Sequence, residues 1–421
     1  MKARSNPLNE VPVVSAICRL CGGGDVEEIL DLGSMPLANH YMPFGKEAVT
    51  ETRYPLALVW CRSCGLLQLR DSVDSDLLFS NYPYASSNSL PSVWHFGAAS
   101  QTLSERYLSG DTDLVVEIGS NDGVFLRNLV PQYRVLGIDG AVNVCELARN
   151  QGIDVICEFL DEEVGIQVRK KFGPAKLIFA ANVLAHVGNL QGFMAAIEHL
   201  LDNDGVLVVE VPYVANMLRD GSFDQIYHEH ACYFSLHNLD SLCRNNSLEM
   251  FEVEHISTHG GSLRVHIKKK GNHTYPAQST VRLMLEREDE IALHHVELYH
   301  EFARKAVHLR QSLSEMVREE YNDGRRIIGY GAPAKATTLL NACGIKHPEI
   351  ECIIDTNRAK VGCQVPGTGI PIVSPKTLRS NPPDLVLILA WNYADYILDV
   401  ESDLTRKGTR FILPYPRPYI V

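Results

Sequence analysis

Short apolar runs alternate with longer amphipathic stretches through the middle of the chain. Residues 114–118, 135–138, 176–181 and 206–211 are four such runs, and each is followed by a glycine, a proline or a polar residue. Buried parallel strands have near-continuous apolar sequences, and helical segments are expected between these runs and, at 95–108, before the first of them. The pattern predicts an α/β fold with a parallel sheet that carries helices on both faces.

Composition and charge narrow the class of protein. A chain of 421 residues with 45% hydrophobic and 21% charged residues is expected to form a globular protein of two to four domains. Its net charge of −12 argues against binding nucleic acid or a membrane surface. The polar N-terminus resembles no secretory signal, no apolar run approaches about 20 residues, and eleven cysteines suggest a reducing compartment. We therefore predict a cytoplasmic protein, and the oligomeric state stays open.

Two matched cysteine pairs lie in the first eighty residues. Cys18 and Cys21, like Cys61 and Cys64, are separated by two residues and followed by glycine. This spacing turns both thiolates toward one tetrahedral ion, so the four cysteines predict a structural zinc site. Redox dithiols and packed thiols are the alternatives, but neither pair begins a thioredoxin-like helix. The short predicted strands at 54–61 and 66–69 would form too small a core without the metal.

A glycine turn follows the first central strand and predicts the cofactor site. Its pattern is Glu-x-Gly-x-Asn-x-Gly, and an acid ends the next strand about twenty residues later, as ribose binding requires. The acid before the first glycine would repel a phosphate but suits a cationic amino acid, which favours S-adenosylmethionine over a dinucleotide. The predicted cofactor residues are Glu117, Gly119, Asn121, Gly123, Asp139 and, after a third strand, Asn182.

The segment from Phe223 to Ser235 is dense in groups that transfer protons. It contains Tyr227, His228, Glu229 and His230. General acid–base chemistry, metal binding and a polar edge strand all fit this composition. Because the segment follows the strand at 206–211, it should fold over the cofactor edge of the sheet, which favours proton chemistry.

Three residues outside that segment are further candidates for the same site. His186 lies just beyond a central strand, where a functional histidine is expected. Tyr82 and Tyr84 lie in a loop that suits a hinge or a lid over the substrate. Thr258–Gly261 is interpreted as a glycine bend that enters an outer strand.

The last third of the chain predicts long helices and a second α/β unit. Residues 279–321 are highly charged with apolar residues at helical spacing, which indicates one or two long helices. Strands are expected near 326, at 350–354 and at 385–390. The residues after these strands could neutralise a diphosphate and stack a base: Tyr330, Gly331, Lys335, Arg358, Lys360, Trp391 and Asn392. A Rossmann-like domain with no such site is the alternative.

In their order along the chain, these motifs resemble the C-methyltransferases that act on nucleotide-linked keto-deoxysugars. The resemblance implies S-adenosylmethionine, a structural zinc ion and a sugar nucleotide, expected to be a dTDP-sugar, between the middle and C-terminal domains. It implies His230 as the base, with Tyr227, Glu229 and His186 beside it and Tyr82 or Tyr84 in a lid.

The domains expected are a zinc-binding domain over 1–78, a class I methyltransferase domain over 79–304 and a Rossmann-like domain over 305–421. Methylation of oxygen or nitrogen, an NAD-dependent sugar-nucleotide enzyme and an inactive binding protein are the alternatives. The nucleotide, the methylated carbon and the pathway are left open.

Overall fold

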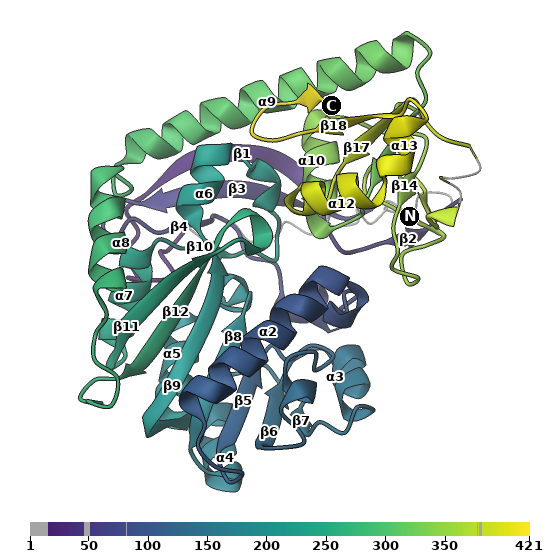
Figure 1. Cartoon of the computed structure of the whole chain (residues 1–421). Coiled ribbons are helices and arrows are strands. Elements are labelled where there is room, and N and C mark those ends of the chain that lie inside the picture. The colour runs from purple at the N-terminus through teal and green to yellow at the C-terminus, as the bar shows by residue number, and fades with distance from the viewer. Residues whose placement is uncertain (1–15, 46–50, 81, 377, 379–380) are drawn as a thin grey trace, which may run out of the picture.

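The computed structural model describes residues 16–45, 51–80, 82–376, 378 and 381–421. The polar N-terminus, where we expect no secretory signal, lies outside them. None of the described helices is long and apolar enough to cross a bilayer. Figure 1 shows a central sheet, N-terminal strands beside it and a C-terminal α/β unit.

The central sheet has seven strands in the order β11-β12-β9-β8-β5-β6-β7. Strands β9, β8, β5, β6 and β7 pair in parallel, as the alternation of apolar runs predicts. In β5, Val116 lies in one hydrophobic core and Val115 in another, so both faces of the strand are buried. The bounds are β5 Leu114–Ile118, β6 Arg134–Ile138, β7 Val155–Ile156, β8 Ala175–Ala181, β9 Leu201–Pro212, β11 Leu248–Ile256 and β12 Ser262–Lys269.

The prediction of an outer strand after the glycine bend is wrong. Strand β12 begins at Ser262, but it lies between β9 and β11 and pairs antiparallel with both. Strand β11 forms the edge of the sheet. Its glutamates, at Glu249, Glu252 and Glu254, alternate with apolar residues and are partly exposed, which is typical of a half-buried antiparallel strand rather than of the apolar central runs.

Helices cover this sheet, and α2 crosses it in Figure 1. Helix α2 begins at Leu90, earlier than the residue 95 that the pattern predicts, because the Ser89 side chain caps Ser92 N and Pro91 occupies the first turn. The other helices of this part are α3 Val142–Arg149, α4 Glu162–Phe172, α5 Leu190–Leu200, α6 Val214–Asp220 and α7 Leu236–Asn245, and α2 ends at Tyr107.

The N-terminal sheet has four strands in the order β1-β3-β4-β10. Its first three strands are β1 Val26–Pro36, β3 Arg53–Cys61 and β4 Leu67–Leu69, and the short helix α1 Ser75–Phe79 follows them. The fourth strand, β10 Cys232–Tyr233, belongs to residues Phe223–Ser235, which we call the Tyr-His-Glu-His segment, and it pairs antiparallel with β4. A segment far along the chain therefore completes the N-terminal sheet. This sheet and the two cysteine pairs form what we call the zinc-binding part.

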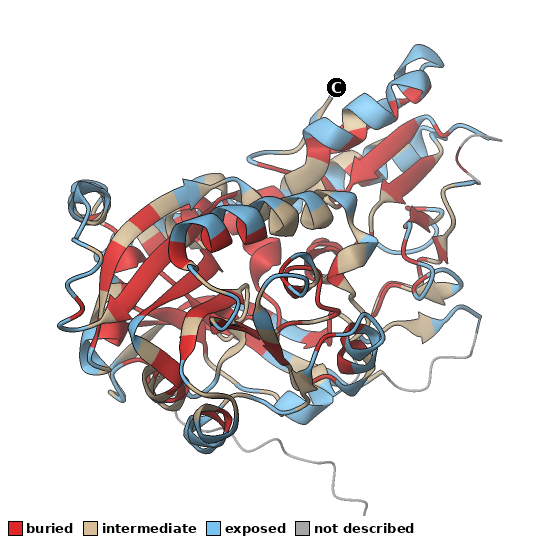
Figure 2. Cartoon of the chain, turned by 60° about the horizontal axis from the view of Figure 1, so that its bottom comes forward, coloured by how far each residue is buried: buried red, intermediate tan, exposed pale blue. Residues whose placement is uncertain are grey.

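Two helices connect the central sheet to the C-terminal unit. They are α8 Ser279–Glu290 and α9 Val296–Asn322, and α9 crosses the domain border that we predict between residues 304 and 305. Helix α9 also lies against the N-terminal strands, where the Trp60 and Tyr299 rings are 5.6 Å apart. In Figure 2 the strands are mostly red and therefore buried, whereas the exposed residues, in pale blue, gather on helices and loops.

The C-terminal sheet has six strands in the order β16-β14-β13-β17-β18-β19. Its strands are β13 Ile327–Tyr330, β14 Ile353–Ile354, β16 Ile372–Val373, β17 Leu385–Ile388, β18 Arg410–Leu413 and β19 Tyr419–Ile420. Helices α10 Ala334–Cys343, α12 Ala394–Val400 and α13 Ser402–Arg406 belong to this unit. A two-stranded sheet of β2 Met42–Pro43 and β15 Cys363–Gln364 joins it to the N-terminal part.

Candidate active site

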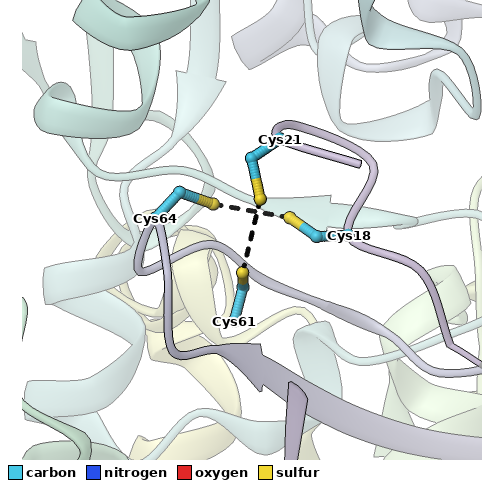
Figure 3. A group of neighbouring side chains, drawn as sticks. All are labelled: Cys18, Cys21, Cys61 and Cys64. Carbon is cyan, nitrogen blue, oxygen red and sulfur yellow. Dashed lines mark hydrogen bonds between the residues drawn. The ribbon is translucent and has the colours of Figure 1, made fainter. Parts of the chain in front are cut away.

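The four predicted zinc ligands converge on one point (Figure 3). The Sγ atoms of Cys18 and Cys64 are 3.4 Å apart, those of Cys21 and Cys61 are 3.6 Å apart, and all four lie within 4.8 Å of one another. Four thiolates about 2.3 Å from a tetrahedral ion would be separated by about 3.8 Å, so the cluster fits zinc. The hydrogen bond between Cys18 and Cys64 lowers the pKa of Cys18 to about 5 and raises the pKa of Cys64, so one thiolate of this pair is favoured.

The zinc-binding part holds the Tyr-His-Glu-His segment in place. Besides the β4–β10 pairing, Leu69 N donates to Ala231 O at 2.9 Å. The side chain of Asn39 donates to Glu229 Oε1 at 2.7 Å, and Asn238 Nδ2, at the start of α7, donates to Cys64 O at 2.9 Å. The metal site and the segment that carries the candidate base therefore form one packed unit.

A cavity of about 390 Å³ lies at the carboxyl ends of the central strands. It extends from the glycine turn after β5 to the Tyr-His-Glu-His segment. The predicted residues that line it are Tyr82, Tyr84, Glu117, Gly119, Asn121, Asp139, Asn182, His186, Tyr227 and His230. Gly123 is absent from this lining; it has a φ of +78°, and a Cβ there would meet the Ile153 side chain at 2.2 Å, so it shapes the turn from behind.

The β5 end of the cavity has groups that suit S-adenosylmethionine. Glu117 Oε2, Ser120 Oγ and Asn182 Oδ1 are buried without a hydrogen-bond partner among the described residues. Unpaired buried oxygens are costly, and an ammonium or hydroxyl group of a ligand would satisfy them. Asp139, the acid predicted to bind the ribose, is held in place because its Oδ2 accepts from Asn121 N at 2.8 Å.

Gly119 allows the close approach that this arrangement needs. Its φ is +66°, and a Cβ at this position would lie 2.3 Å from Val183 Cγ2. A side chain here would therefore be strained in the backbone and would also clash with the wall of the cavity.

We expect Glu117→Gln to weaken binding of S-adenosylmethionine by about tenfold to a hundredfold, as loss of a charge-assisted hydrogen bond to a cation would. Burial raises the pKa of Glu117 in the free protein, so a cationic ligand is what favours its ionised form. Calorimetric titration measures the change in affinity. Glu163→Gln, on the exposed first turn of α4, serves as the control. Equal affinity in the wild type and Glu117→Gln would contradict this role.

His230 has a defined tautomer at the other end of the cavity. Its Nδ1 lies 2.9 Å from the carbonyl oxygen of Gln225, which can only accept, so Nδ1 carries the proton. Its Nε2 lies 2.7 Å from the Tyr227 hydroxyl, which donates to it. The His186 ring is 5.1 Å from the His230 ring, measured between centroids. Nε2 is therefore unprotonated, and in the free protein its lone pair accepts the hydrogen bond from Tyr227.

Burial sets the ionisation of these groups. It lowers the pKa of His230 well below its usual value and lowers the pKa of His186 to about 4, so both imidazoles are neutral at pH 7. Burial also raises the pKa of Tyr227, which keeps its phenol protonated. The cluster thus combines a neutral base with a neutral hydrogen-bond donor.

Glu229, between His228 and His230 in the sequence, is buried and accepts hydrogen bonds from two donors. Asn39 Nδ2 donates to Oε1 at 2.7 Å and the Tyr82 hydroxyl donates to Oε2 at 3.1 Å. Burial raises the pKa of Glu229 to about 7 despite these bonds. Tyr84 also lines the cavity, but its hydroxyl pairs with Ser92 Oγ at 3.2 Å. Of the two loop tyrosines, Tyr82 is the one bound to the Tyr-His-Glu-His segment.

His228 lies apart from the other candidates. Its Nε2 is 3.3 Å from Tyr54 O in β3, and its ring packs against that tyrosine. It is absent from the lining of the cavity among the described residues. The turn closed by His230 N and Tyr227 O, at 2.9 Å, directs the two histidines to different neighbours.

The C-terminal candidates form a separate group, and none of them is among the described residues that line the cavity. Lys335 Nζ is 3.1 Å from Asn392 Oδ1 and 4.5 Å from the centre of the Trp391 ring. Trp391 Nε1 donates to Asp224 Oδ2 at 2.7 Å. These contacts build a partly buried cationic and aromatic patch.

The remaining C-terminal candidates have other contacts. Lys360 Nζ donates to Ala332 O at 2.7 Å, and Tyr330 Oη donates to Glu401 Oε1 at 3.0 Å. Asp355 Oδ2 accepts from Ala332 N at 2.7 Å, so a carboxylate of the chain occupies one amide of the glycine turn at Gly331. Arg358 is exposed.

Two residues of the site were not singled out from the sequence. His259 lines the cavity, but its surroundings were interpreted only as a bend. Asp224 is buried and accepts from Trp391 Nε1, although it belongs to the segment that contains the candidate base. A histidine before a glycine pair is the signal that could have identified His259.

Comparison with known proteins places these features in a family. Residues 18–79 match a zinc binding domain, residues 98–253 a methyltransferase domain, and residues 257–416 the C-methyltransferase C-terminal domain. The chain is 36% identical over 407 residues to the C-methyltransferase NovU of Streptomyces niveus, a match that covers 96% of each chain.

Solved structures resemble a smaller part of the chain. A SAM-dependent methyltransferase from Anabaena variabilis is 16% identical over 41% of this chain and 84% of its own, with a TM-score of 0.33. Another from Thermotoga maritima is 18% identical over 42% of this chain and 91% of its own, with a TM-score of 0.32.

Proposed function

Because this chain belongs to the C-methyltransferase family and uses S-adenosylmethionine, we propose that its acceptor is a nucleotide-linked 4-keto-deoxysugar, methylated on a carbon next to the ketone. The residue that carries this proposal is His230. It places an unprotonated Nε2 in the cavity, with a phenol and a second histidine beside it. A carbon acid next to a ketone requires such a base, since it is too weak to lose its proton unaided.

The Tyr-His-Glu-His segment performs the proton transfer. His230 Nε2 removes the proton from the carbon, and the electron pair of the broken C–H bond moves toward the ketone oxygen. The Tyr227 hydroxyl, bound to Nε2 in the free protein, turns to donate to the developing enolate oxygen. His186 is a second neutral donor on this side of the cavity. Gln225 O holds Nδ1–H throughout and stabilises the imidazolium.

Glu229 and Tyr82 maintain the geometry around the base. The carboxylate links the lid loop, through Tyr82, to the N-terminal part, through Asn39. A closed loop excludes water from a carbanion that water would otherwise reprotonate. S-adenosylmethionine supplies an electrophilic methyl group, and Glu117, Gly119, Asn121, Asp139 and Asn182 would hold it. Binding both reactants in one cavity makes the transfer effectively unimolecular.

The C-terminal unit supplies groups that suit the nucleotide and its diphosphate. Lys335 is buried against Trp391 and Asn392, and the indole N–H of Trp391 donates to Asp224. We assign contact with the phosphates to Lys335 and stacking on the nucleotide's base to Trp391. The exposed Arg358 would contact the diphosphate from the solvent side. In this proposal residues 1–78 are the zinc domain, 79–304 the methyltransferase domain and 305–421 the domain that holds the nucleotide.

Mass spectrometry of the purified protein with S-adenosylmethionine and a panel of dTDP- and GDP-linked 4-keto-deoxysugars tests the substrate class. We expect one sugar nucleotide to gain a methyl group. In deuterated water, deuterium should enter the unreacted substrate, because proton removal precedes methyl transfer. Exclusive methylation of a hydroxyl or amine, located by NMR, would contradict carbon as the acceptor. No product from any sugar nucleotide would contradict the substrate class.

A further inference from the structure

His259 is held in a backbone conformation that is uncommon for residues other than glycine, although histidine tolerates it better than most. Its φ is 55°, in the left-handed region. The turn around it is fixed on both sides: Asn216 Nδ2 donates to Gly260 O at 3.1 Å, and Ser262 Oγ donates to Thr258 O at 2.9 Å. Strain of this kind persists only where the surroundings determine it, and it is concentrated at functional sites.

His259 lines the cavity that His186 and His230 also line. It makes no hydrogen bond with any residue that the structure describes, whereas the neighbouring His230 uses both of its ring nitrogens. A neutral imidazole has one donor and one acceptor, so His259 presents both to a ligand.

The turn also contacts the cationic and aromatic patch of the C-terminal unit. A Cβ on Gly260 would lie 2.7 Å from the Trp391 ring, so that ring packs directly on the backbone next to His259. Lys335 lies over the same ring at 4.5 Å. His259 therefore shares a cavity with His230, and its turn contacts the ring that carries Lys335, the group assigned to the phosphates.

We propose that His259 is a substrate-positioning residue that hydrogen-bonds a diphosphate oxygen where the sugar nucleotide passes from Lys335 to the cavity. This inference rests on the proposed function, since it requires a substrate with its reacting carbon at His230 and an anionic group at Lys335. Lys335 acts electrostatically on both histidines, so a ligand that reaches from Lys335 to His230 would come close to His259. The Trp391 ring packs against Gly260 and also contacts Lys335, so it holds the turn that carries His259 close to the proposed phosphate contact.

The electrostatic surroundings give the contact a measurable signature. Four charged or titratable groups act on His259: Lys335, His95, Glu210 and His186. Burial, with Lys335 and His95, lowers the pKa of His259 to about 3, so it is neutral before binding. A diphosphate beside it and Lys335 brings negative charge, which favours the imidazolium. Binding should therefore take up a proton.

Calorimetric titration with dTDP at pH 7, in two buffers of different ionisation enthalpy, tests this contact. For the wild type we expect the binding enthalpy to depend on the buffer. His259→Asn should bind dTDP about tenfold more weakly, as loss of one hydrogen bond to a charged group implies, and without the buffer dependence. Asparagine tolerates the left-handed conformation, and His259→Gly, which removes the strain altogether, should show the same two losses.

Kinetics and a matched control separate positioning from folding. With the sugar nucleotide as substrate, both variants should raise KM more than they lower kcat, and His273→Asn, at an exposed loop histidine, should change neither. Wild-type affinity and buffer dependence in His259→Asn would overturn this inference and leave the proposed function standing. Failure of the wild type to bind dTDP, with no turnover of any sugar nucleotide, would overturn both.

Discussion

His230→Asn is expected to retain S-adenosylmethionine binding and to lower kcat for methyl transfer by about a hundredfold to ten-thousandfold, the usual contribution of a positioned general base. Asparagine can still donate an amide N–H toward Gln225 O, but it has no nitrogen lone pair in the position of Nε2. Deuterium exchange into the substrate should disappear together with turnover, because both need the same proton transfer.

Two matched variants give that experiment its contrast. Tyr227→Phe keeps the ring beside His230 but removes the hydroxyl that lies 2.7 Å from Nε2. It should slow methyl transfer and retain more deuterium exchange than His230→Asn does. His294→Asn, at an exposed position, should behave as wild type. Turnover by His230→Asn within tenfold of wild type, or deuterium exchange that persists in it, would contradict the assignment of His230 as the base.

Removal of the zinc ion is expected to abolish activity and to unfold the N-terminal part of the chain. Structural zinc sites contribute about 10–16 kcal/mol of apparent binding free energy in small domains, which exceeds the stability of most domains. Cys61→Ser removes a buried ligand and should give protein with less than one zinc ion per chain, a lower Tm and no methyl transfer. Metal analysis, thermal denaturation and turnover measure the three effects.

The expected loss of activity follows from the shared sheet rather than from zinc chemistry. When β4 loses its order, the partner of β10 is lost, and with it the support of the segment that contains Glu229 and His230. Cys352→Ser, at a thiol outside the zinc cluster, is the control and should keep its zinc and its activity. A zinc-free Cys61→Ser protein with wild-type turnover would contradict this coupling.

Local sequence was sufficient to predict that the residues at the β5 end of the cavity lie together. The run Leu114–Ile118, the glycine turn and Asp139 are close in the chain, and their geometry depends on hydrogen bonds that span few residues. The four cysteines were predictable for the same reason, since each pair is a short turn with its own glycine. The order of the strands, and which strand forms the edge of the sheet, could not be predicted from local sequence. Pairing between β9, β12 and β11 places these strands, and β9 is distant from the other two in the chain.

The roles within the Tyr-His-Glu-His segment required the structure. In an extended strand His228 and His230 would share a face, but the turn from Tyr227 to His230 sends one to Tyr54 and the other to the cavity. The predicted lysines show the same limit. Lys335 meets Asn392 and Lys360 meets Ala332, both through contacts that no local pattern records.

The pairing of β10 with β4 has a consequence for attempts to divide or recombine this protein. Cutting the chain after residue 78 would leave β4 and β10 each with an unpaired edge, and exposed strand edges recruit other chains. An N-terminal segment transplanted from a relative must therefore match the recipient at residues 231–233 as well as at its own junction. The unit to be transplanted in this enzyme is the zinc-binding part together with Phe223–Ser235, although 144 residues, 79–222, lie between them in the chain.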